Sequence, residues 1–431
     1  MTTLTNLRPN TGRTSANLAR FAPPGSERSE TTPFEQAASL ALERLQRAFR
    51  SLLEAVPGGI RKAADLQRAF DLDSKLAGQV FKVANASDPI ATGLNVPPRI
   101  SLERLLKSAT RRHIPGALVS RVAEAFEQFE RMVQEQAGDR DEFDSLIAAF
   151  IGDEREKLLL ASREMMYHAS RNIRGMASET AFSTALFLPA HDDPERLEIV
   201  RLSADLGLRR IHRGAKILVR NSSSYATDQV LTIDGQPIVD HSSVMLADFC
   251  STPLPDYRVA RIEANSPDVW YRLEGDDVGI RSAVDAVRAD YLRPALKTRY
   301  WSPERPLLRV IKESSIPARW QVVDILTTED VASMQSSEAF IHEMLPLGDL
   351  MQFPVTERVE EAVAYKPVVR YMGNGPGAFR CSRFPRYEEM LEFVCIKRGW
   401  DLSRLHGFRV EIEYPVYSWQ TCLAVTKLPK P

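Results

Sequence analysis

Residues 60–83 read IRKAADLQRAFDLDSKLAGQVFKV, and this stretch predicts two short helices joined by a tight turn. We expect the first helix over 61–70, the turn at 71–73 and the second helix over 74–83. Asp73 suits the N-cap of the second helix, because its carboxylate can accept hydrogen bonds from the unpaired backbone N–H groups that follow. The apolar residues of both helices are expected to meet in one small core: Leu66, Phe70, Leu72, Leu76 and Val80.

The second predicted helix keeps a set of small, polar and basic residues on the face away from that core. They are Ser74, Lys75, Gly78, Gln79 and Lys82. Side chains of these types suit DNA phosphates and base edges. In spacing and composition, residues 60–83 resemble the helix-turn-helix motif of DNA-binding proteins. The resemblance implies that the second helix reads DNA.

The resemblance has three departures from the usual pattern. Many such motifs have glycine at the start of the turn, where this chain has Asp71. A small residue is usual where Gln67 stands, and a β-branched residue is common where Ala77 stands. The alternative interpretation is an ordinary helical hairpin in an all-α domain.

The length and composition are those of a globular protein with more than one domain. A chain of 431 residues exceeds the size at which a single hydrophobic core stops growing, so two or three domains are expected. Hydrophobic residues make up 44% and charged residues 26%, which is ordinary for globular chains.

Several features indicate a cytoplasmic location. No apolar run approaches the length that crosses a bilayer, and no signal-peptide-like apolar segment stands at the N-terminus. The four cysteines are far apart and form no CxxC pair, which favours reduced thiols in a core over a disulfide framework. We therefore expect no membrane partner.

The near-neutral net charge of −1 conceals an asymmetry along the chain. Residues 1–137 hold 19 Lys/Arg and 14 Asp/Glu, a balance of +5, whereas the remainder holds 37 against 43, a balance of −6. Within 61–121 the numbers are 11 and 5, a balance of +6. A positive region around the helix-turn-helix-like segment fits an electrostatic footprint for DNA.

The first half of the chain predicts a tail followed by helices. Residues 1–33 are rich in Thr, Ser, Pro and Arg and predict a flexible tail. Apolar residues at helical spacing predict an all-α domain over 34–137 and a connecting helix over 138–177. Near the end of one of these helices, Arg111 and Arg112 are placed either to contact phosphates or to complement the helix C-terminus.

Residues 178–431 predict a β-rich α+β domain, possibly of two lobes, so the fold class of the whole chain is α+β. Asp234-Gly235 predicts a tight hairpin turn, since both residues tolerate positive φ. Helices are expected over 280–292, 338–344 and 386–393. Strands are expected over 182–189, 197–202, 216–219, 229–233, 244–249, 258–262, 269–273, 307–311, 320–325, 367–371, 392–397, 408–414 and 421–426.

The chain carries no recognisable set of catalytic side chains. Its seven histidines form no HxH, HExxH or HxxxH pattern, so no metal ligand is assigned. No GxSxG elbow or P-loop is present, so no catalytic residue and no cofactor is assigned. The sequence therefore favours a non-enzymatic protein.

The leading interpretation is a DNA-binding transcriptional regulator with a C-terminal ligand-sensing or oligomerisation domain. Its expected partners are double-stranded DNA, a second copy of the chain in a homo-oligomer, most simply a dimer, and a small-molecule effector. The predicted DNA-binding residues are Arg61, Arg68, Ser74, Lys75, Gln79, Lys82, Arg111 and Arg112.

Two alternatives stay open. A helical adaptor followed by a large β-rich assembly domain would have a similar sequence and would not bind DNA. An enzyme or small-molecule-binding protein would instead gather residues such as His241, His342 or Cys381 in one compact polar pocket.

Overall fold

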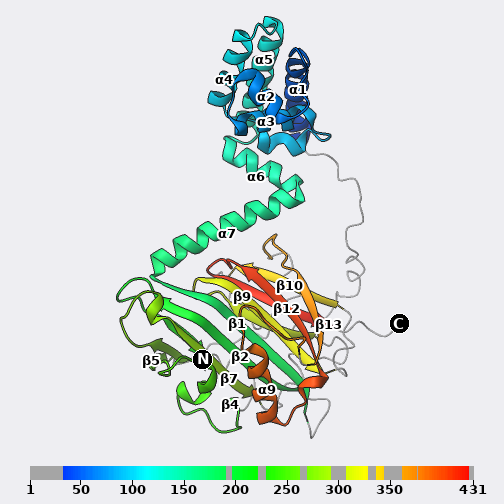
Figure 1. Ribbon diagram of the computed structural model, residues 1–431. Coiled ribbons are helices and arrows are strands. Elements are labelled where there is room, and N and C mark those ends of the chain that lie inside the picture. Colours follow the sequence, from blue (N-terminus) through cyan, green and yellow to red (C-terminus); the bar gives the residue numbers. More distant parts are fainter. Residues whose placement is uncertain are drawn as a thin grey trace, which may run out of the picture. The chain divides into compact units, whose positions relative to one another are not determined.

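The computed structural model describes residues 33–190, 197–221, 230–262, 269–292, 307–328, 336–343, 362–375 and 377–426. They form two compact units that divide the chain after Leu158 (Figure 1). Helices make up the first unit and three sheets dominate the second, so the predicted α+β class is confirmed. The tail expected over 1–33 lies outside the described residues, apart from Pro33, which begins the first helix. None of the described helices is long and apolar enough to cross a bilayer.

The helical unit is built from short and medium-length helices around one apolar core. These are α1 (Pro33–Glu54), α2 (Ala63–Phe70), α3 (Ser74–Asn85), the 3₁₀ helix η1 (Ile90–Asn95), α4 (Arg99–Arg111), α5 (Gly116–Gln136) and α6 (Arg140–Phe150). The segment expected as one connecting helix holds two. Of these, α6 packs on the helical core through Phe143 and Ile147, whereas α7 (Gly152–Arg174) continues from the first unit into the second.

The local structure predicted for residues 60–83 is confirmed. Asp73 is the N-cap of α3, and its carboxylate accepts a hydrogen bond of 2.8 Å from the Leu76 N–H. Asp71 adopts a left-handed conformation with φ of 53°, which explains why glycine is common at this point of similar turns. The five residues expected in the small core are all buried, between 0% and 7% exposed.

The β-rich unit is organised around a seven-stranded sheet with the order β11-β12-β9-β1-β2-β7-β4. Neighbouring strands in it are antiparallel except β1 and β9, which are parallel. Two three-stranded sheets accompany it, β10-β13-β8 and β3-β6-β5. The strands are β1 (Met176–Pro189), β2 (Leu197–Arg210), β3 (Leu218–Asn221), β4 (Val230–Thr232), β5 (Tyr257–Ile262), β6 (Val269–Leu273), β7 (Val284–Leu292), β8 (Leu307–Glu313), β9 (Ala318–Thr328), β10 (Ser336–Glu343), β11 (Val369–Asn374), β12 (Leu405–Glu413) and β13 (Trp419–Thr426).

The large sheet is covered on both faces, as the alternation of side chains along β1 shows. Phe182 and Leu186 belong to the core that contains the helix α9 (Tyr387–Arg398). Ala185 and Phe187 belong to the core shared with β8, β10 and β13. Because successive side chains of a strand point to opposite faces, one strand contributes to both cores.

Two of the helices predicted in this unit are wrong, and one is confirmed. Residues 280–292 form a 3₁₀ turn, η4 (Ile280–Ser282), and then strand β7, which pairs with β2 and β4. Of the residues expected as a helix over 338–344, 338–343 belong to strand β10, paired with β13. The helix expected over 386–393 is α9, which is longer than predicted.

Two of the predicted strands are also wrong. Residues 244–249 lie mostly in two 3₁₀ turns, η2 (Ser242–Val244) and η3 (Ala247–Phe249). Residues 392–397 belong to α9, whose buried side includes Met390, Val394 and Cys395. The tight turn at Asp234-Gly235 is confirmed, since Gly235 has φ of 78° and its N–H donates to the Thr232 carbonyl at 2.8 Å.

A buried ion pair lies inside the β-rich unit. Asp324 on β9 and Arg409 on β12 are 0% and 1% exposed and form two hydrogen bonds of 2.9 and 2.7 Å. The Tyr387 hydroxyl on α9 donates to Asp324 Oδ2 at 2.7 Å and lies 2.8 Å from Thr184 Oγ1 on β1. This network joins α9 to the central strands of the large sheet.

Candidate nucleic-acid interface

Helix α3 divides sharply into a buried and an exposed side. Its buried residues are Leu76, Ala77, Val80, Val83 and Ala84. They place α3 against α1, α2 and η1. Because 3.6 residues make one turn, the opposite side collects residues 74, 75, 78, 82 and 85.

The predicted DNA-reading residues of α3 lie on this exposed side or at its edge. Ser74, Lys75 and Lys82 are exposed, and Gln79 is half-buried. Lys75, Gln79 and Lys82 are spaced i, i+4, i+7 and so form one row along the helix. At the middle of the exposed side is Gly78, where an added Cβ would meet nothing within 4 Å.

A second basic row runs along α4, and the sequence interpretation missed most of it. Arg104, Lys107 and Arg111 are spaced i, i+3, i+7 and all three are exposed. Only Arg111 was predicted as a site residue. The spacing of these three cations can be read from the sequence. The contact that joins α4 to α3 cannot.

That link is an ion pair at the start of α3. Arg104 Nη1 lies 3.1 Å from Asp73 Oδ2, the carboxylate that also caps α3. One turn later on α4, the Ser108 hydroxyl donates to the Phe70 carbonyl at the end of α2. The hydrogen bond from the Leu76 N–H has the largest effect on the pKa of Asp73 and lowers it; burial, the next largest effect, opposes this, and the Arg104 guanidinium lowers the pKa further, so the net shift is below the ordinary value. The basic row of α4 is therefore attached to the end of α3 that carries Lys75.

The other residues predicted to contact phosphates differ in their surroundings. Arg112 is exposed and is the C-cap residue of α4, next to Arg111. Arg68 on α2 is also exposed, but it is paired with Asp65 at 2.7 Å. The backbone N–H of Arg61 donates to the same Asp65, at 3.2 Å. The structure thus groups Arg61 and Arg68 around Asp65.

Five exposed cations of α3 and α4 have no described carboxylate partner. We call the exposed residues Lys75 and Lys82 on α3 with Lys107, Arg111 and Arg112 on or next to α4 the basic face. None of the five forms a salt bridge with a residue that the structure describes. Such cations keep their full charge available for a partner, because no carboxylate neutralises them.

His241, His342 and Cys381, which were expected to share one polar pocket if the chain were an enzyme, lie on separate elements of the β-rich unit. His241 lies between the rings of Tyr257 and Tyr271, each 4.5 Å away, and burial lowers its pKa to about 3. His342 is on β10, and Cys381 belongs to the core around α9, where burial raises its pKa. A neutral imidazole and a protonated thiol in different places do not make a catalytic pair.

Comparison with known proteins does not show a family for this chain. No family model matches it, and no curated protein matches it. Solved structures with a distant likeness include a candidate protease from Parabacteroides distasonis (7% identity, 59% of this chain and 41% of that chain, TM-score 0.27). A variant of the M1 zinc metallopeptidase from Deinococcus radiodurans is similar at the same level (9% identity, 58% and 42%, TM-score 0.25). A candidate nutrient-binding protein from Legionella pneumophila is another (5% identity, 58% and 67%, TM-score 0.26).

The matched part of this chain spans less than half the length of the first two of these proteins. At these TM-scores and identities the likenesses carry no argument about fold or function.

Proposed function

We propose that the helical unit binds double-stranded DNA through α3 and the basic row of α4. The observation that supports this most strongly is the basic face, in which five exposed cations without described carboxylate partners lie on two helices tied together by Arg104 and Asp73. Phosphate neutralisation by such side chains supplies most of the affinity of nonspecific DNA binding.

In this proposal α3 lies in the major groove. Lys75 and Lys82 are the side chains with the reach and charge to contact guanine O6 and N7. Gln79 is half-buried, so it contributes less than either lysine. Gly78 lets the backbone of α3 approach the groove, because it carries no side chain at this point of the exposed side.

The remaining predicted residues contact the backbone of DNA. Arg111 and Arg112 reach phosphates from the end of α4, and we include the exposed Lys107, which lies one turn before Arg111 on the same helix. Ser74 stands at the first position of α3, where its exposed hydroxyl can donate to a phosphate oxygen. Arg68 contributes less, because its guanidinium is already paired with Asp65, whereas only the backbone N–H of Arg61 donates to Asp65 and its exposed side chain can still reach a phosphate.

The β-rich unit is proposed to sense a ligand or to set the oligomeric state of a transcriptional regulator. A single recognition helix reads few base pairs, so a dimer on two half-sites is the expected arrangement. Support for self-association comes from α7, where Met165, Met166 and Ile173 are 66%, 48% and 85% exposed. Apolar surface of this kind is typical of interaction sites.

The proposal is tested by fluorescence anisotropy of the full-length protein with a labelled mixed-sequence duplex of roughly 30 base pairs, long enough for two half-sites. We compare the wild type with Lys75→Glu/Lys82→Glu between about 50 and 200 mM salt. The expected result is salt-sensitive binding by the wild type and a loss of more than about tenfold in the variant, since two contacts become repulsive.

The matched control is Lys216→Glu/Lys366→Glu, which makes the same change in charge at two exposed lysines of the β-rich unit. It should retain the wild-type affinity. Absence of binding by the wild type at low salt would overturn the proposal, as would equal losses in the two variants.

A further inference from the structure

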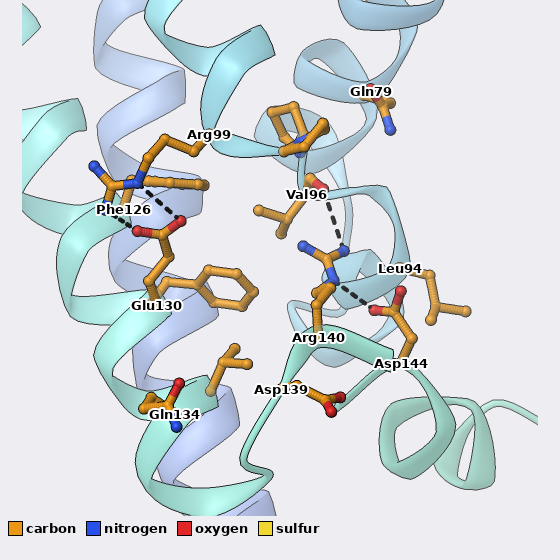
Figure 2. Close-up of a pocket in the computed structure, with 14 residues that line it drawn as sticks. Gln79, Leu94, Val96, Arg99, Phe126, Glu130, Gln134, Asp139, Arg140 and Asp144 are labelled. Atoms are coloured by element: carbon orange, nitrogen blue, oxygen red, sulfur yellow. Dashed lines mark hydrogen bonds and ion pairs between the residues drawn. The ribbon is translucent and has the colours of Figure 1, made fainter. Parts of the chain in front are cut away.

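The helical unit contains a cavity of about 680 Å³ that the DNA-binding proposal does not use. It opens between the segment that leads into α4, helix α5 and the start of α6, and Gln79 of α3 lies at its edge (Figure 2). Its apolar lining includes Val96, Phe126, Phe129 and Val133. Volumes of 300–1,000 Å³ with an apolar lining and a few polar groups are usual for small-molecule sites.

Two ion pairs stand in the wall of this cavity. On α5, Glu130 binds Arg99, the first residue of α4, through both carboxylate oxygens. On α6, Arg140 Nε donates to Asp144 Oδ1 at 2.7 Å. Figure 2 shows the two pairs facing each other across the aromatic side chains.

Arg99 and Arg140 both already interact with other groups of the protein. Arg140 donates through Nη2 to the carbonyls of Gly93 and Val96, at 3.1 and 3.2 Å. Its guanidinium also lies 5.6 Å from the centre of the Phe129 ring, and that of Arg99 lies 5.8 Å from the centre of Phe126. Each guanidinium is already paired with a carboxylate, so its positive charge is largely balanced and attracts an anionic ligand less than an unpaired guanidinium would.

The carboxylates, in contrast, are in excess. The lining holds three of them, Glu130, Asp139 and Asp144, against the two guanidiniums, a balance of −1. Asp139 Oδ1 accepts from the Glu142 N–H at 2.8 Å, and Asp144 Oδ1 accepts from Arg140. The second oxygen of each aspartate receives no hydrogen bond from a residue that the structure describes.

Asp144 is only partly compensated by its arginine partner. Burial raises the pKa of this carboxyl above its ordinary value, although Arg140 acts in the opposite direction. One guanidinium therefore does not fully stabilise the ionised form. A second positive charge placed against Oδ2 would favour it.

We propose that this cavity binds a small organic cation, namely a protonated amine on an aromatic or aliphatic body. In this proposal the carboxylates of Asp139, which is exposed, and Asp144, which is partly exposed, attract the ammonium group, and the body lies on Phe126, Phe129 and Val133. Aromatic rings also attract cations through their faces, which adds to the preference for a cation over a neutral isostere. The site stands whether or not the unit binds DNA.

The test uses isothermal titration calorimetry on the full-length protein with three probes of similar shape. They are phenethylamine hydrochloride as the cation, phenethyl alcohol as the neutral compound and 3-phenylpropionate as the anion. We expect saturable binding of the amine below about 10 mM, weaker binding of the alcohol and none of the anion.

Variants locate the site. Asp139→Asn keeps an N-cap acceptor for α6 and removes one charge, so it should weaken the amine about tenfold without unfolding the helix. Val133→Trp should fill the cavity and abolish binding. Glu135→Gln, which removes a charge from an exposed residue of α5 outside the lining, is the control and should bind as the wild type does.

A second carboxylate variant, measured together with thermal stability, separates the loss of a ligand contact from the loss of the fold. Asp144→Asn should also weaken the amine, while thermal unfolding of each variant shows that the fold is retained. No saturable binding of the amine would overturn the inference. Equal binding of all three probes, a preference for the anion, or binding unchanged by Asp139→Asn and Val133→Trp would also overturn it.

Discussion

The two units place their charges in opposite positions. In the helical unit, an apolar core lies inside and the basic face lies outside, on Lys75, Lys82 and the end of α4. In the β-rich unit, Asp324 and Arg409 lie inside, between the large sheet and α9. Charges held inside are paired within the fold, so that removal of one partner leaves the other buried and uncompensated, whereas charges left outside without described partners are available to bind another molecule. This contrast is why we place DNA binding in the helical unit.

The largest expected effect on stability comes from breaking the buried pair. Asp324→Asn leaves Arg409 buried without its carboxylate, which should lower the free energy of unfolding by about 3–5 kcal/mol. Urea denaturation measures the loss, and anisotropy measures DNA affinity under native conditions. The contrast predicts a large loss of stability with unchanged affinity. A change in affinity without a change in stability would reverse the roles that we assign to the two units.

The next largest effect is expected in the small core beneath α3. Leu76 is 1% exposed, so Leu76→Ala should cost about 2–5 kcal/mol and weaken DNA binding by loosening α3. Lys75→Glu/Lys82→Glu should change stability by only about 0.5 kcal/mol or less, because both residues are exposed. Circular dichroism during thermal unfolding separates the two variants. Equal melting points would argue against the division of α3 into a structural and a binding side.

A smaller effect with the opposite sign is expected at Gly78. Gly78→Ala should stabilise the helical unit by about 0.5–1 kcal/mol, because alanine is the better helix former and its Cβ meets nothing within 4 Å. Under the DNA-binding proposal, Gly78→Leu should weaken DNA binding by holding the α3 backbone away from the groove. Denaturation and anisotropy of both variants are the measurements. Unchanged affinity in the leucine variant would remove Gly78 from the interface.

The smallest effect is a pH dependence at the N-cap of α3. The pKa of Asp73 is lowered in the folded state, so its contribution to stability is present above the unfolded-state pKa and is lost as the pH falls through the folded-state value. Asp73→Asn retains the cap but cannot titrate. The difference in unfolding free energy between wild type and variant should be constant above about pH 5 and shrink below the ordinary aspartate pKa near 3.9. A difference that grows on acidification would contradict the assignment.

Local patterns in the sequence predicted some parts of this structure well. The turn at 71–73, the cap at Asp73 and the hairpin turn at Asp234-Gly235 depend on residues within a few positions of each other. Strand β7 was read as a helix because Val284, Val287 and Tyr291 also have helical spacing. Its pairing with β2 and β4, which are distant in sequence, decides its conformation.

The candidate sites also contain residues that local sequence patterns predict and residues that only tertiary contacts bring together. Lys75 and Lys82 could be predicted, because the apolar residues of α3 show which side is exposed. The attachment of the α4 row to α3 could not, since it depends on Arg104 meeting Asp73 across 31 positions of the chain. Nor could the cavity, whose lining comes from four separate segments. Tertiary placement of this kind has no periodic signal in the sequence.

The most direct test of the central claim is the salt dependence of DNA binding when the α4 end of the basic face is removed. We compare the slope of log Kobs against log salt for the wild type and for Lys107→Gln/Arg111→Gln/Arg112→Gln. Each phosphate contact contributes about 0.9 to this slope, so the account predicts that its magnitude falls by roughly 2–3. A slope unchanged by the triple substitution would contradict the claim that these exposed cations contact DNA.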